Sequence, residues 1–138
     1  MSLAARLMAS VDGEVTLDLL GVGAVAGQLT RVATGWCLVR GPGQDWVIRL
    51  DAIGAVHGGS DRAQPEVAWP PVARLGLSAA LRRLADGAEP CTLHLVDGRR
   101  YDGVLLRVGA DFVEVATGEA GRLVLVAFRR LAAVQSRR

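Results

Sequence analysis

Lysine and asparagine are absent from this chain of 138 residues, and isoleucine, phenylalanine and tyrosine are scarce. All 16 basic residues are therefore arginine. The missing and scarce types have AT-rich codons, so a GC-rich coding sequence accounts for the bias without any functional pressure. The abundance of arginine is for this reason no evidence of a nucleic-acid partner.

Cysteine and histidine are also few, with two residues of each. Cys37 and Cys91 do not occupy matching positions in the two halves of the chain, so both are predicted to pack as small core residues without a disulfide. No cysteine and histidine cluster has metal-site spacing, and the glycines of residues 21–27 precede a strand, unlike a phosphate-binding loop. His94 is expected on the exposed face of its strand. We expect no enzyme, no cofactor, no metal and no small-molecule substrate.

Long hydrophobic runs are missing too, although 51% of the residues are hydrophobic. The longest apolar run covers residues 123–128, far short of the roughly 20 residues that span a bilayer. Residues 2–9 lack the long apolar stretch of a signal peptide. We therefore expect a cytoplasmic protein with no membrane partner.

The chain does contain an internal repeat. With a shift of 76 residues, Thr16, Leu17, Leu19, Gly27, Leu29, Arg31, Val32 and Val39 match Thr92, Leu93, Leu95, Gly103, Leu105, Arg107, Val108 and Val115. After a change of two residues in a turn the match resumes, and Leu50, Ile53, Ala55 and Val56 match Phe128, Leu131, Ala133 and Val134. The sequence thus predicts one small unit built twice. Units of this size have marginal cores, so we expect the two to pack together.

Each unit is predicted to be a short helix followed by five strands. Helices are expected over residues 2–9 and 78–86, the second with Ser78 as N-cap and Gly87 as its stop. Alternating apolar residues and turn signals predict β-barrels over residues 14–57 and 90–135, with Gly27 and Gly103 allowing a sharp bend in the second strand. The fold class is mainly β, with unit one at residues 1–57, a linker at 58–73 and unit two at 74–138.

The second unit resembles the first motif of the Sm-like (LSm) proteins. Its residues from Leu95 to Val115 read LVDGRRYDGVLLRVGADFVEV, which is similar to the family's pattern of apolar, Asp-Gly-Arg, Gly, apolar, Asp and apolar positions. The first unit keeps Gly27 and Trp36 but has Gly35 where Asp111 stands. The resemblance, which extends to uncharacterised actinobacterial proteins with two such units, implies two tandem five-stranded Sm-like barrels.

The resemblance also implies an RNA-binding alternative. Asp111 matches the aspartate that contacts a base in Sm-like proteins, and Phe112 follows it. The phosphate contacts would come from Arg99, Arg107, Arg129 and Arg130. Residues 70–138 carry eleven arginines against seven acidic residues, a net charge of +4, while residues 1–69 carry −2. Against RNA stand the carboxylates in the same region, the lack of asparagine and the presence of only six aromatic residues to stack bases.

A protein partner is the interpretation that the sequence favours. The second unit is apolar on both faces where the first is not, at Val104 and Leu106 and along residues 123–128. A strand that is apolar on both faces must be covered twice. Candidate interface residues are Val104, Leu106, Leu123 and Leu125, with Trp69 either packed against a barrel or anchoring a partner. We expect a non-catalytic assembly or protein-interaction module that binds itself or another protein.

Overall fold

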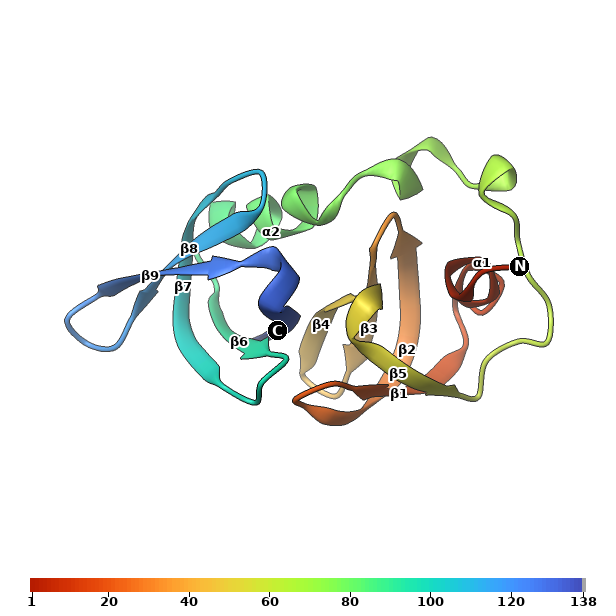
Figure 1. The fold of residues 1–138 in the computed structure, drawn as a ribbon, viewed down its shortest axis with the longest axis horizontal. Helices are drawn as coiled ribbons and strands as arrows, with labels where there is room; N and C mark the ends of the chain where they lie inside the picture. The colour runs from red at the N-terminus through yellow and green to blue at the C-terminus, as the bar shows by residue number, and fades with distance from the viewer. Residues whose placement is uncertain (138) are drawn as a thin grey trace.

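The computed structural model describes residues 1–137 of the chain and contains ten strands, two α-helices and four short 3₁₀ turns (Figure 1). The first half contains α1 (Leu3–Met8), β1 (Glu14–Leu19), β2 (Gly23–Ala33), β3 (Trp36–Gly41), β4 (Gln44–Arg49), η1 (Leu50–Ala52) and β5 (Ile53–His57). The connection contains η2 (Glu66–Ala68) and η3 (Pro71–Arg74). The second half contains α2 (Leu77–Asp86), β6 (Pro90–Leu95), β7 (Arg100–Val108), β8 (Phe112–Thr117), β9 (Arg122–Ala127), η4 (Phe128–Arg130) and β10 (Leu131–Arg137). The expected mainly β class is therefore correct.

All ten strands belong to one antiparallel sheet in the order β5-β1-β2-β3-β4-β10-β6-β7-β8-β9. The order within each half is the same, with the fifth strand beside the first. The predicted closure into two barrels is wrong for the described residues, because no pairing closes either half on itself. A strand has only two edges, and β10 uses them for β6 and for β4 of the other half. One continuous, strongly bent sheet results.

The helices differ in how they begin. In α1 the Ser2 hydroxyl accepts a hydrogen bond from the Ala5 N–H at 3.1 Å and caps the helix. The predicted N-cap of α2 is wrong, because the N-cap is the extended Gly76, two residues before Ser78, and the helix begins at Leu77. The Ser78 hydroxyl instead donates to the Gly109 carbonyl at 3.3 Å. Ser78 therefore holds α2 to the loop between β7 and β8.

The second strand of each half approaches its neighbour closely. A Cβ added at Gly27 would run into the Arg40 carbonyl, and one at Gly103 would run into that of Ala116. In both strands the register shifts just beyond the glycine, after Leu29 and after Leu105. Glycine at these positions lets the strand bend over the core without a backbone clash.

Two hydrophobic clusters lie under the sheet, and they do not divide cleanly between the halves. The second-half cluster of Leu81, Leu93 and Val134 also contains Trp36 and Val47 of the first half. Trp69 from the connection is only 5% exposed, packs in the first-half cluster and donates its indole N–H to the Gln64 carbonyl at 2.8 Å. Of the two interpretations of Trp69, the structure has the packed one, so this residue is not a surface anchor.

Candidate interaction surfaces

Strand β9 ends the sheet with an apolar edge. Its Leu123 and Leu125 side chains are 63% and 64% exposed, and Leu106 on β7 is 46% exposed. The opposite face of β9 is covered, because Val126 is 3% exposed. The only strand paired with β9 among residues 1–137 is β8. We call Leu106, Leu123 and Leu125 the apolar edge; it lies at one end of the molecule (Figure 1), and Val104 beside it is half-buried.

Strand β4 is the counterpart of β9 in the repeat, and it is covered. Leu38 pairs with Val47 in the β3·β4 register, as Glu114 pairs with Leu125 in the β8·β9 register. Val47 is only 6% exposed, because α2 and β10 of the second half pack on it. The same position is thus buried in one half and open in the other.

The contact between β4 and β10, which we call the internal joint, combines strand pairing with buried polar contacts. His94 Nε2 lies 2.9 Å from Gln135 Oε1, and the Gln135 amide donates to the side-chain oxygen of Gln44. The Trp46 ring stacks on His94 with ring centres 5.2 Å apart. The expected exposure of His94 is wrong, since it is 6% exposed. The face of β6 that carries His94 would be exposed to solvent in an isolated second half, but Trp46 of β4 covers it here.

Three arginines of the second half gather along a rim formed by neighbouring turns. The Val96 N–H donates to the Arg130 carbonyl at 2.9 Å, and the Phe128 N–H donates to the Asp111 carbonyl at 2.8 Å. These bonds bring the β6–β7 turn, η4 and the loop before β8 together. The guanidinium groups of Arg99, Arg129 and Arg130, which we call the basic rim, belong to exposed residues. Asp97 lies among them, with its carboxylate 3.5 Å from Arg99 Nε.

The other two predicted RNA-site residues lie differently. Phe112 is half-buried, and its ring fills the space where a side chain at Gly109 would be. Arg107 stands exposed on β7 opposite Glu114. Backbone hydrogen bonds therefore join the segments that carry Arg99, Asp111, Arg129 and Arg130, and Arg107 lies on β7 just before the loop that carries Asp111.

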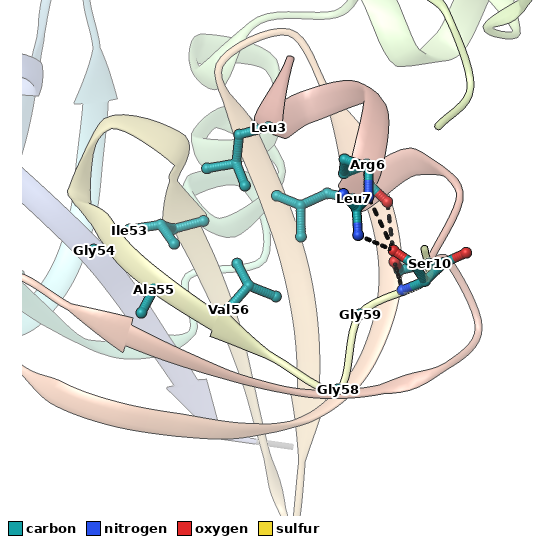
Figure 2. Close-up of a pocket in the computed structure, with 11 residues that line it drawn as sticks. Leu3, Arg6, Leu7, Ser10, Ile53, Gly54, Ala55, Val56, Gly58 and Gly59 are labelled. Atoms are coloured by element: carbon teal, nitrogen blue, oxygen red, sulfur yellow. Dashed lines mark hydrogen bonds between the residues drawn. The ribbon is translucent and has the colours of Figure 1, made fainter. Parts of the chain in front are cut away.

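A pocket of about 400 Å³ lies at the other end of the sheet, between α1 and the free edge of β5. Figure 2 shows the side chains of Leu3, Leu7, Ile53 and Val56 pointing into one space. Its far end is closed by hydrogen bonds of Arg6 and Ser10. The Arg6 guanidinium donates to the Ser60 carbonyl at 2.7 Å and 3.0 Å, and the Ser10 hydroxyl accepts from the Ser60 N–H at 2.8 Å. The pocket is therefore lined by apolar side chains and by polar groups, and it is bounded by a strand edge.

Sequence reasoning missed this pocket. Leu3 and Leu20 are exposed at 45% and 60% beside β5, but single apolar residues near the chain start gave no periodic signal. Leu20, which does not line the pocket, matches Val96 at the same offset as the other repeated positions. Val96 is half-buried, since Gly21 of the first half packs against its backbone.

Reactive groups are few among residues 1–137. Burial raises the pKa of the Cys37 thiol to about 12. Burial, and to a smaller extent the nearby Glu89 carboxylate, raises the pKa of the Cys91 thiol to about 11. Neutral buried thiols are poor nucleophiles. His57 Nε2 lies 2.9 Å from Asp18 Oδ2 in an exposed pair. Within the described part of the chain, no three histidine, cysteine or acidic side chains gather as metal ligands would.

No protein-family model and no curated protein matches this chain. The functional argument therefore rests on its own surfaces. None of the helices in residues 1–137 has both the length and the apolar character required to cross a bilayer.

Proposed function

We propose that this protein is a non-catalytic association module of the cytoplasm that binds protein through the apolar edge of β9. The observation that carries the proposal is the contrast between Val47 and Leu125, which occupy matching positions at 6% and 64% exposure. Where the chain supplies its own cover, this position is buried. In the second half, where no other part of the described chain covers this position, the larger apolar residue Leu125 is exposed to solvent.

The composition of β9 supports this proposal. Its sequence RLVLVA carries one charge, at Arg122, and no proline. Edge strands that must stay unpaired are usually blunted by charges, proline or bulges, because their free N–H and C=O groups invite another strand. β9 lacks these protections along its apolar part. Strand addition is thus the recognition mode that fits its chemistry.

The shared strand order of the two halves supports a tandem arrangement of two related units. We propose that these are Sm-like units of the kind the second-half motif resembles. The asymmetry between them is then functional. The edge of the first unit is used inside the chain, and the edge of the second is left for a partner.

The proposal is tested by mass measurement and by copurification. We expect Leu125→Asp to abolish association seen by light scattering, with Val67→Asp, at an 85% exposed apolar position in the connection, leaving it unchanged. Pull-down of the whole chain from its native cell, with and without ribonuclease, identifies the class of partner. Association that persists in Leu125→Asp and depends on RNA would overturn the proposal.

RNA binding is a second candidate, favoured by the basic rim. Its arginines and Asp111 lie on adjoining turns, where a single strand could run past them. We then expect Arg129→Ala with Arg130→Ala to lower affinity for short U-rich and A-rich oligonucleotides. Each lost phosphate contact reduces the log-log salt slope by about 0.7. Tight, sequence-selective binding that is lost in Phe112→Ala would favour this function over protein association; weak binding that disappears at moderate salt would reject it.

A further inference from the structure

We propose that a pocket between the two halves binds a small apolar monocarboxylate, a class that includes medium-chain fatty acids and aryl-alkanoic acids. The pocket has a volume of about 500 Å³, which is in the range of sites that hold small ligands. It lies between β3 and β4 on one side and η3 and α2 on the other. This surface is separate from the apolar edge of β9, and the inference does not rest on the association function.

Both halves of the chain build this pocket, which we call the inter-half pocket. The first half contributes Trp36 and Val47, which are 4% and 6% exposed. The second half contributes Ala80 and Leu84 of α2. The Trp36 indole N–H donates to the Leu75 carbonyl at 2.8 Å and so holds the connection against β3. The apolar lining therefore depends on the two halves being joined.

The connection forms a wall of the inter-half pocket and leaves apolar side chains open beside it. Val72 and Leu75 line the pocket and are 47% and 50% exposed. The connection runs along the top of Figure 1 and ends in α2. Its backbone is fixed here, because the Thr34 N–H and hydroxyl both donate to the Ala73 carbonyl, at 2.9 Å and 3.4 Å. The wall is thus held in place before any ligand binds, which lowers the entropic cost of binding.

Arg31 of β2 places a positive charge against the apolar lining. In the β2·β3 register Arg31 lies opposite Leu38, and both line the pocket. At the matching positions of the second half, Arg107 lies opposite Glu114. The first half thus keeps the arginine of the repeat but has an apolar side chain where the carboxylate stands. Arg31 is half-buried and its guanidinium stays charged, so an anion beside it is favoured.

The charges that line the pocket leave one positive charge unmatched. Arg83 of α2 supplies a second guanidinium, and none of the ion pairs among residues 1–137 involves Arg31 or Arg83. Two carboxylates also line the pocket. Asp45 already has a guanidinium partner, with its Oδ1 3.8 Å from Arg40 Nε, and Glu89 is exposed. Two guanidinium groups against one exposed carboxylate fit a monoanion better than a cation or a dianion.

A carboxylate on an apolar body is the ligand chemistry that matches this lining. One guanidinium can donate two parallel hydrogen bonds to a carboxylate. Ser136, which lines the pocket from β10 and is 5% exposed, carries a hydroxyl that can donate another. A phosphate or a sugar would leave the apolar lining uncovered, and an uncharged lipid would leave the guanidinium groups without a partner.

The experiment titrates the whole chain with four probes and follows the backbone amide shifts by NMR. Octanoate and phenylbutyrate carry a carboxylate on an alkyl or an aryl body, while octanol and octylamine keep an alkyl body and change the head group. We expect both carboxylates to shift the amides of residues 36, 75 and 83. Octanol should bind at least about tenfold more weakly than octanoate, because it offers no charge to the guanidinium groups. Octylamine should bind more weakly still.

Single variants separate the charged part of the site from the apolar part. Arg31→Gln and Arg83→Gln should each lower octanoate affinity by about tenfold to hundredfold and leave octanol affinity unchanged. Arg82→Gln is the matched control, because it removes an exposed guanidinium of α2 that does not line the pocket. Leu75→Asp should weaken octanoate and octanol alike, with Val67→Asp as its control. Thermal melting at the wild-type temperature shows that each variant is folded.

Several results would overturn the inference. Octanol or octylamine that binds as tightly as octanoate would show that the guanidinium groups do not select the ligand, and so would an octanoate affinity unchanged in both Arg31→Gln and Arg83→Gln. Failure of both carboxylates to bind at millimolar concentration would reject the site. Leu125→Asp should bind octanoate as wild type does. Loss of binding in that variant, or shifts confined to β9, would place the ligand on the apolar edge and not between the halves.

Discussion

A single substitution made at two matching positions tests how the internal joint stabilises the chain. Val47→Asp and Leu125→Asp change counterpart residues of β4 and β9, at 6% and 64% exposure. Burying a valine side chain contributes about 1.5–3 kcal/mol, and an unpartnered polar group placed there costs about 1–3 kcal/mol more. We therefore expect Val47→Asp to lower the free energy of unfolding by about 2.5–6 kcal/mol. Leu125→Asp should change it by about 0.5 kcal/mol or less, as exposed substitutions do.

The assay is urea unfolding followed by tryptophan fluorescence, since Trp36 and Trp46 both lie at the joint. Measurements are made at a dilution where the Leu125→Asp protein is monomeric. The difference between the midpoints, at equal slopes, gives the difference in stability. Equal losses in the two variants would refute the reasoning, because they would mean that Val47 is no more covered than Leu125.

Other expected outcomes follow from close packing, thiol burial and the apolar edge. Gly103→Ala should destabilise the fold far more than Gly41→Ala, because a Cβ at Gly103 meets the Ala116 backbone while one at Gly41 has its nearest neighbours at 3.6 Å; thermal melts compare them. Burial raises the pKa of the Cys37 thiol from its ordinary value of 9.0 to about 12, so above pH 9 this thiol ionises only in the unfolded chain and alone should lower stability by about 1.4 kcal/mol per pH unit. In urea titrations at pH 8 to 10, Cys37→Val should remove the part of the decline that Cys37 causes and leave the part due to Cys91, whose pKa is about 11; an unchanged slope would disprove the assignment. Leu106→Arg should weaken association by roughly 1 to 3 kcal/mol, measured by light scattering against concentration.

Local patterns predicted the elements of this chain well. The alternation of Val15, Leu17 and Leu19 corresponds to buried positions of β1, and the repeat correctly indicated an α-helix followed by five strands in each half. Gly98 has a positive φ of 90° in the β6–β7 turn, a conformation that glycine adopts readily. These features depend on residues within one hairpin, so the sequence carries them locally.

The pairing of strands that lie far apart in the sequence could not be predicted from such local patterns. Periodicity states which face of β10 is apolar but not which strand lies at its free edge, so the pairing with β4 was missed and closed barrels were expected in its place. His94 was misassigned for the same reason, because its cover comes from Trp46 in the other half. The apolar edge was anticipated from Leu123 and Leu125, whereas the α1–β5 pocket has no local signal, because α1 and β5 lie far apart in the sequence.

Hydrogen exchange of β9 tests the central claim most directly. The backbone amides of residues 122–127 are compared at high and low protein concentration in wild type and in Leu125→Asp, with the β3 amides as an internal reference. Protein association through the apolar edge predicts that exchange in β9 slows at high concentration in wild type and stays fast in the variant. Exchange in β9 that is equally fast at every concentration, in a protein that nevertheless forms assemblies, would contradict the claim that this edge is the contact.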